Sequence, residues 1–280
     1  MSKSTYAYYH SDKHLNACKK REMEDARILK LIKPVFEHHK HRYGYRRIIL
    51  AIPELKGINH KRIQRIMSEH GLVGKQPKCK YHSYKGDNGE YKENLLLYAE
   101  ECTKKGTKIY KRDFSTSRPN EKWTTDVSEF KVGSQKLYLS PIMDMYDDSI
   151  ISYDISRHPN FAQTKRMIEQ AFIKNKNIDG LIFHSDQGWQ YQMKPYQNWL
   201  KEKGIKQSFS RKGNCMDNSL MENFFGIMKN EMYYEHEYKN IEELELAMHE
   251  YIEYYNNERI NLKRKGLTPL QFRYQSLSLN

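Results

Sequence analysis

The sequence predicts an α/β protein in two parts: a small all-α domain, then a larger domain with a mixed β-sheet and flanking helices. The first observation is charge, because residues 1–120 contain 27 Lys and Arg against 13 Asp and Glu, whereas residues 121–280 contain 21 against 22. The second is periodicity. Apolar residues of the first part recur at helical spacing, and those of the second form short strand-like runs around amphipathic helices.

These changes along the 280-residue chain predict four segments. We expect an N-terminal arm over 1–25, a helix-turn-helix domain over 26–75, a basic linker over 76–118, and an α/β domain with a C-terminal helical segment over 119–280. The positive charge of the first part indicates a polyanion as its partner. If the charge served only solubility, acids would be mixed with it along the whole chain.

Two amphipathic stretches predict the helix-turn-helix. Residues 27–41 place apolar side chains every three to four residues, and residues 59–71 combine an N-cap, a buried apolar stripe and a terminal glycine. The second stretch is basic, which favours DNA contact over a helix bundle with a solvated basic face. The expected DNA contacts are Arg46, Arg47, Lys61, Arg62 and Arg65. The linker is expected to lie along DNA and to contain one short helix near 93–102.

Composition excludes several classes of protein. No apolar run approaches the roughly 20 residues of a bilayer span, and the first residues lack the apolar core of a secretory signal. The four cysteines are scattered without a Cys-x-x-Cys pair, so neither a disulfide framework nor a zinc knuckle is indicated. We expect a reducing, cytoplasmic location and no membrane partner.

The pattern of apolar residues in the second part predicts a β-sheet packed with helices. Strands are expected at 122–132, 136–143 and 150–155, an amphipathic helix at 162–174, and a short apolar strand at 181–185. Further helices follow at about 194–203, 217–232 and 241–257. Trp123 is expected in the core, His184 as a packed strand residue, and the acidic cluster at 144–148 as a turn.

Three carboxylates occupy unusual positions in this second part. Asp126 interrupts a strand, where Asp is depleted and a buried unpaired carboxylate is costly. Asp186 ends an apolar strand, at the sheet edge where ligands collect, although alone it also suits a turn or N-cap. Glu222 and Lys229 share one face of a helix, together with Phe225, opposite the apolar stripe. Together, the three carboxylates suit one or two hard cations, Mg²⁺ or Mn²⁺, with Lys229 on a flanking phosphate.

The order of these motifs resembles a known family. Trp-Thr-Thr-Asp126 is followed by His-Ser-Asp186-Gln-Gly and by Asp217-Asn-Ser-Leu-Met-Glu222-Asn-Phe-Phe, with Lys229 seven residues further and 35 residues between Asp186 and Glu222. This set resembles the OrfB-type transposases of two-reading-frame bacterial insertion sequences, whose catalytic domain is similar to that of retroviral integrases. Tyr43-Gly-Tyr-Arg-Arg-Ile and Tyr254-Tyr-Asn-Asn-Glu-Arg-Ile-Asn are similar to flanking motifs of the family.

The resemblance implies an RNase H-like catalytic domain over 119–280, with Asp126, Asp186 and Glu222 as catalytic residues and metal ligands. Two Mg²⁺ or Mn²⁺ ions are expected per active site. The implied reactions are cleavage at the element ends and attack by the freed 3′-hydroxyl on another phosphodiester. Lys229 is expected to contact the transposon end, and a basic loop at Arg211 and Lys212 is expected to clamp phosphates. The zinc module of retroviral integrases is not reproduced.

The resemblance also implies partners and a place in the cell. Double-stranded DNA is expected as partner, both the terminal inverted repeats and the target, with the protein a homo-oligomer on DNA in the bacterial nucleoid. The upstream reading-frame product is a further expected partner, as a fusion or a separate chain. Two alternatives remain: a catalytically inactive DNA-binding regulator of transposition, and a structure-selective RNase H-like nuclease that cuts without joining.

Overall fold

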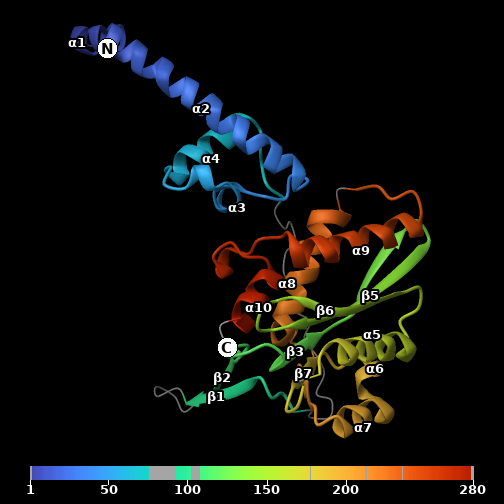
Figure 1. Cartoon of the computed structure of the whole chain (residues 1–280). Helices are drawn as coiled ribbons and strands as arrows, with labels where there is room; N and C mark the ends of the chain where they lie inside the picture. The colour runs from blue at the N-terminus through green and yellow to red at the C-terminus, as the bar shows by residue number, and fades with distance from the viewer. Residues whose placement is uncertain are drawn as a thin grey trace. The chain divides into compact units, whose positions relative to one another are not determined.

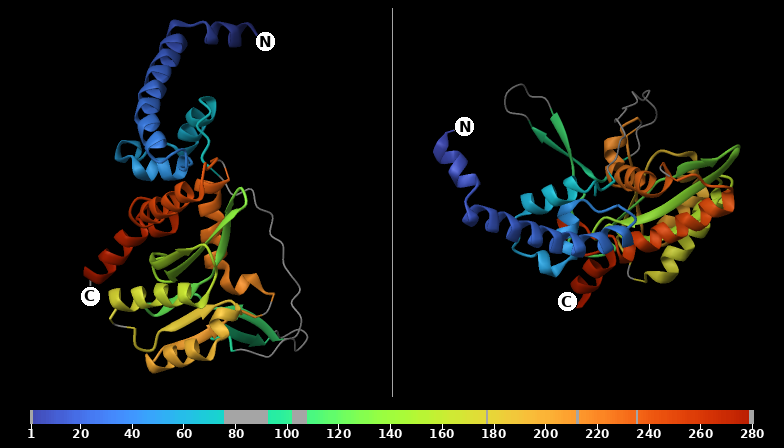
Figure 2. Two further views of the ribbon diagram at one scale, coloured as in Figure 1. Left: turned by 90° about the vertical axis from the view of Figure 1, so that its right-hand side faces the viewer. Right: turned by 90° about the horizontal axis from the view of Figure 1, so that it is seen from above.

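A computed structural model of the chain describes residues 2–75, 93–101, 108–176, 178–211, 213–234 and 236–278 (Figures 1 and 2). The fold has two compact units, Met1–Gln76 with Ile260–Gly266, and Pro77–Arg259 with Leu267–Asn280. Most of the predicted linker and Lys212 lie outside the described residues. No helix in the described part of the chain is long and apolar enough to cross a membrane.

The first unit is helical, as the sequence predicts. Its longest helix, α2, begins at Asp12 rather than near residue 27 and therefore crosses the predicted boundary between arm and domain. Only its second half packs, through Ile28, Ile32 and Phe36. The elements of the unit are α1 (Lys3–Tyr9), α2 (Asp12–His38), α3 (Tyr45–Ala51), the 3-10 turn η1 (Pro53–Leu55) and α4 (His60–Glu69).

The cap, apolar stripe and terminal glycine that predict helix α4 are all present in the structure. The Asn59 side chain accepts a hydrogen bond from the Lys61 N–H at 2.9 Å, which caps the first turn. Ile63, Ile66 and Met67 are buried as predicted. Gly71 follows the helix with a φ of +67°, a left-handed conformation that glycine adopts without strain.

The second unit contains a six-stranded mixed sheet in the order β4-β5-β3-β7-β8, with β6 also paired to β5. Strands β3 and β7 are parallel, as are β7 and β8, whereas β3, β4 and β6 run antiparallel to β5. The bounds are β3 (Lys122–Thr125), β4 (Ser128–Val132), β5 (Gln135–Asp144), β6 (Ile150–Ser156), β7 (Ile182–Ser185) and β8 (Lys206–Phe209).

Helices cover both faces of this sheet (Figure 1). Helix α5 packs on the face that carries Ser140 and Ile142. The Ser140 hydroxyl, for example, donates a hydrogen bond to the Met167 sulfur of α5 at 3.2 Å. The opposite face, with Phe130 and Leu137, packs against α9 and the segment after α8. The helices are α5 (Phe161–Lys174), α6 (Trp189–Gln192), α7 (Lys194–Glu202), α8 (Ser219–Met228), α9 (Ile241–Asn257) and α10 (Pro269–Ser278). The predicted α/β fold class is confirmed.

The fold corrects the sequence analysis at two places. The short helix predicted near 93–102 is wrong, because β1 (Leu97–Glu101) pairs antiparallel with β2 (Lys108–Arg112), and this pairing prevails over a weak local helical pattern. The single helix predicted over 217–232 is three pieces: the 3-10 turn η2 (Cys215–Asn218), α8, and the π-helical turn η3 (Lys229–Tyr233). The described part of the predicted linker therefore folds as part of the second unit.

Candidate active site

Strand pairing brings two of the three carboxylates to one edge of the sheet. Strands β3 and β7 are parallel with Thr124 opposite His184, so Asp126 and Asp186 each follow the strand in the same register. Adjacent strands lie about 4.8 Å apart. The two aspartates therefore lie side by side at the carboxyl ends of neighbouring strands, where ligands of α/β sheets bind.

Asp126 sits at a break in what the sequence predicts to be one strand. Strands β3 and β4 both pair with β5, Thr125 opposite Ile142 and Ser128 opposite Leu139, and Asp126 and Val127 lie between the two strands. The Asp126 carboxylate accepts a hydrogen bond from the Val127 N–H at 2.8 Å. The break lets a carboxylate lie half-buried where a continuous strand would bury an apolar side chain.

Asn218 attaches the helix of the third carboxylate to strand β3. Its side-chain oxygen accepts from the Thr124 hydroxyl at 2.5 Å, and its side-chain N–H donates to the Thr125 carbonyl at 3.1 Å. Residues four apart on a helix share a face, so Glu222 lies one turn beyond Asn218 on the face that meets β3. The sequence analysis did not single out this attachment by Asn218, although the place of Asn218 four residues before Glu222 was a usable signal.

The carboxylates act on one another electrostatically. Burial, then the charge of Asp186, and more weakly that of Glu222, raise the pKa of Asp126 to about 7. Burial also raises the pKa of Asp186, against a hydrogen bond from the Gly188 N–H at 2.9 Å. Such mutual repulsion is relieved by a cation. Asp126, Asp186 and Glu222 thus form one electrostatically linked cluster, and their assignment as catalytic residues and metal ligands stays a prediction.

The donor set of this cluster suits a hard divalent ion. All its donors are carboxylate oxygens, which Mg²⁺ and Mn²⁺ prefer. The nearby His184 is buried and held by the hydroxyls of Ser208 and Ser210 at 2.8 and 3.0 Å, and burial lowers its pKa to about 4, so it is a neutral packed residue as predicted. The oxygens of the three carboxylates do not all lie within 4.8 Å of one another. An ion shared by all three would therefore require the carboxylate side chains to move closer together.

Lys229 lies beside the cluster, at the start of the π-helical turn after α8. Its ammonium group is 5.0 Å from the centre of the Phe130 ring on β4, and its charge lowers the pKa of Asp126 slightly against the larger raising effects. Phe225, expected on the same face as Glu222, is buried. Helix α8 therefore packs on more than one side, and the face that carries Glu222 is not purely exposed to water.

A buried aspartate organises the loop before α8. Asp217 is 1% exposed and accepts hydrogen bonds from the Arg112 guanidinium at 2.7 Å, the Arg211 guanidinium at 2.9 and 3.0 Å, and the Asn94 amide at 3.1 Å. Arg211, predicted to bind DNA, thus has its guanidinium engaged by Asp217. The sequence gives no signal for Asn94 and Arg112, which are more than 100 residues away.

The remaining predicted DNA contacts lie in the first unit. Arg46 and Lys61 are exposed, and Arg47 is half-buried. Arg62 and Arg65 form ion pairs with Asp25 of α2. These roles stay predictions.

The acidic cluster at the other end of β3 is structural. Asp144 lies opposite Trp123 in the sheet, and Arg273 of α10 donates to both Asp144 at 2.9 Å and Asp147 at 2.7 Å. Asp144 is three residues from Asp126 along the paired strands, about 10 Å. It therefore does not join the carboxylate cluster.

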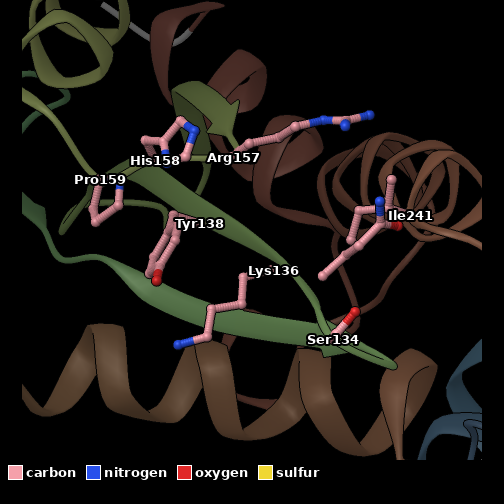
Figure 3. Close-up of a pocket in the computed structure, with 8 residues that line it drawn as sticks. Ser134, Lys136, Tyr138, Arg157, His158, Pro159 and Ile241 are labelled. Carbon is pink, nitrogen blue, oxygen red and sulfur yellow. The ribbon is translucent and has the colours of Figure 1, made fainter.

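A separate hollow lies near the β4–β5 hairpin (Figure 3). Its volume is about 320 Å³, and Lys136, Tyr138 and Arg157 are among its lining residues. Lys136 pairs with Glu129 at 3.0 Å and Arg157 with Glu242 at 2.7 Å. Lys136 is opposite Lys131, five residues beyond Asp126, so the hollow is about 17 Å along the sheet from the carboxylates and is not part of their site.

Two integrase core domain models match residues 116–215 and 222–277, and an HTH-like domain model matches residues 23–80. Among solved structures, the catalytic core domain of HTLV-2 integrase in complex with magnesium is 20% identical and has a TM-score of 0.44, covering 56% of this chain and 97% of that chain.

Curated relatives are similar over most of their length. The putative transposase InsK for insertion sequence element IS150 of Escherichia coli is 46% identical over 275 residues, 98% of this chain and 90% of that protein. A transposase-like protein of Haemophilus influenzae is 52% identical over 79% of this chain and 95% of its own length. The transposase for IS904 of Lactococcus lactis is 30% identical over 90% of this chain and 96% of that protein. With this identity along nearly its whole length, the chain belongs to the OrfB-type insertion-sequence transposases with an integrase core.

Proposed function

We propose that this transposase cleaves DNA at the ends of its insertion sequence and joins the freed 3′-hydroxyl to another phosphodiester, with Asp126, Asp186 and Glu222 as its catalytic residues. The observation that carries the proposal is the convergence of two in-register strand ends with a helix attached to the same strand through Asn218. Two Mg²⁺ or Mn²⁺ ions bound there would activate the attacking hydroxyl and stabilise the leaving oxygen.

The residues of the chain supply positioning and charge. The three carboxylates would hold the ions at the sheet edge, where the ions would supply positive charge to the reacting phosphodiester. The ammonium group of Lys229, whose charge acts on Asp126, would pair with a flanking phosphate of the element end. Arg211 keeps the loop before α8 in place through Asp217.

DNA is the proposed partner of both units. The element ends and the target would occupy the second unit, and the first unit would bind flanking duplex. Because two ends must be joined, we propose a homo-oligomer on DNA, with the upstream reading-frame product as a fusion or separate partner, acting at the bacterial nucleoid.

The test is cleavage and strand transfer on labelled DNA that carries the ends of the element. Wild type should act with Mg²⁺ or Mn²⁺ and not with EDTA, whereas Asp186→Asn and Glu222→Gln should bind the same DNA without cutting it. A wild type that binds but never cuts, even fused to the upstream product, contradicts the proposal and favours the regulator. Cutting without dependence on paired ends favours the nuclease.

A further inference from the structure

The basic residues of α4 are largely neutralised within the first unit. The Arg62 guanidinium donates to Asp25 at 2.7 Å. The Arg65 guanidinium is paired with Asp25 and also with Glu69 at 2.8 Å. Although burial opposes it, the hydrogen bonds from Arg65 and Arg62 keep the pKa of Asp25 below its ordinary value. Binding a phosphate through either arginine would require this network to break.

A second basic feature of the same unit is a pocket of about 390 Å³ at the start of α3. Its lining includes Arg42, Arg46, Arg47 and Lys75. No Asp or Glu is among the described residues that line it. The surrounding chain is also basic, with 17 Lys and Arg against 7 Asp and Glu in residues 1–75. The pocket therefore concentrates positive charge in a concave site.

The backbone builds this pocket. A Cβ atom on Gly74 would lie 2.5 Å from the Gly44 nitrogen and 2.8 Å from the Tyr43 carbonyl carbon, so the two chain segments approach as closely as glycine allows. The Lys75 N–H donates to the His41 carbonyl at 3.1 Å and holds the segments together. The position of Lys75 beside α3 is thus fixed by main-chain contacts.

Neighbouring groups also orient the arginine side chains. The Arg46 Nε donates to the Tyr45 hydroxyl at 3.1 Å. The Arg47 guanidinium donates to the Arg42 carbonyl at 3.4 Å and lies 5.6 Å from the centre of the Tyr43 ring. Arginine guanidinium groups are the donors that form forked hydrogen bonds to phosphate oxygens.

We infer that this pocket binds a backbone phosphate of duplex DNA, and that the first unit docks on DNA through the start of α3 rather than through Arg62 and Arg65 of α4. The inference rests on the proposed function, which supplies DNA as the partner. A phosphate fits better than a base edge, because several cations converge on one small site. The site would fix the register of the unit on DNA without reading sequence.

The salt dependence of DNA binding by the full chain tests this inference. Affinity for a duplex with an element end is measured by fluorescence anisotropy over a series of salt concentrations, for wild type and for the double variant Arg46→Ala with Lys75→Ala. The slope of log K against log salt should fall by about 1 to 2 in the variant. Affinity for an unrelated duplex should fall by the same factor as for the element end.

The matched comparison is the double variant Arg62→Ala with Arg65→Ala, which removes the same number of charges from α4. It should lose thermal stability, because Asp25 loses its partners, and keep the wild-type slope. A methylphosphonate at the contacted phosphate should weaken wild type and leave the Arg46 and Lys75 variant unaffected. Thermal unfolding of that variant at the wild-type temperature establishes that its fold is intact.

Two results overturn the inference: a wild-type slope in the Arg46 and Lys75 variant, or a reduced slope in a folded Arg62 and Arg65 variant. Failure of the proposed function has a different outcome. A wild type that binds DNA with the expected slope yet never cleaves it contradicts the catalytic proposal and leaves the phosphate pocket standing.

Discussion

Replacing Asn218 by alanine tests whether the attachment of α8 to β3 sets the position of Glu222. Asn218 is buried, and its amide bonds both the Thr124 hydroxyl at 2.5 Å and the Thr125 carbonyl at 3.1 Å. Both partners immediately precede Asp126. Loss of the amide should therefore free the first turn of α8 from the strand that leads to Asp126.

The size of the effect follows from these contacts. Each buried hydrogen bond contributes about 1 kcal/mol net, so Asn218→Ala should lower the free energy of unfolding by about 2 kcal/mol. A shift of about 1 Å in a catalytic group costs about 100-fold in rate. Single-turnover cleavage should therefore slow by about 100-fold at a temperature where the variant is still folded.

Asn256 provides a matched control. It is a buried asparagine of α9 that also makes two hydrogen bonds, both of 2.9 Å, with the N–H and the carbonyl of Ile150. Asn256→Ala should lose about the same free energy of unfolding in urea, and it should cleave at the wild-type rate. The comparison separates general destabilisation from displacement of Glu222.

The reasoning is refuted if Asn218→Ala is destabilised as expected and still cleaves element-end DNA at the wild-type rate. It is also refuted if both asparagine variants slow cleavage equally, since the effect would then follow stability and not the attachment to β3.

Three further predictions concern stability. Burial and the charge of Asp186 raise the pKa of Asp126 in the folded protein to about 7, above its value in the unfolded chain. The metal-free protein should therefore lose stability as pH rises toward about 7. The variant Asp126→Asn should raise Tm above that pH and leave it unchanged near pH ~4, and equal gains in Tm at both pH values would contradict this reasoning. Glu231→Ala leaves Arg259 buried without its 2.8 Å partner and should lower the free energy of unfolding in urea by about 3–5 kcal/mol. The control Glu242→Ala, at an exposed ion pair, should lower it by less than about 1 kcal/mol. Similar losses of free energy in the two variants would contradict this prediction. Gly74→Ala forces main-chain atoms apart and should lower the unfolding temperature of the first unit in a thermal melt, whereas an unchanged melt would argue against the close approach.

Much of the fold and of the carboxylate site was predictable from local patterns. Asp126 and Asp186 are conspicuous because each interrupts or ends an apolar strand, and a parallel pairing then places them side by side. The Glu222 helix was predictable from its spacing. These features depend on residues close in sequence, where periodicity and strand composition act directly.

The parts that sequence reasoning missed depend on long-range contacts. The β1–β2 hairpin forms by pairing across a connecting segment, and the short edge strand β8 is fixed by its parallel pairing with β7. Two arginines of α4 are paired with Asp25, which is 37 residues from Arg62 and 40 from Arg65. Charge counts alone do not show which cations already have partners.

The position of Glu222 depends on two consecutive residues that are anchored to different elements. Asp217 accepts from Arg112 on β2 and from Arg211, and hydrogen bonds from Arg211 keep its pKa low although burial opposes this, so it stays ionised and paired. Asn218, the next residue, is bonded to β3. The first turn of α8 is therefore fixed before the chain reaches Glu222. Strand β2 lies between the segments matched by the HTH-like and integrase core models, so the geometry of the carboxylate cluster also depends on a hairpin outside both.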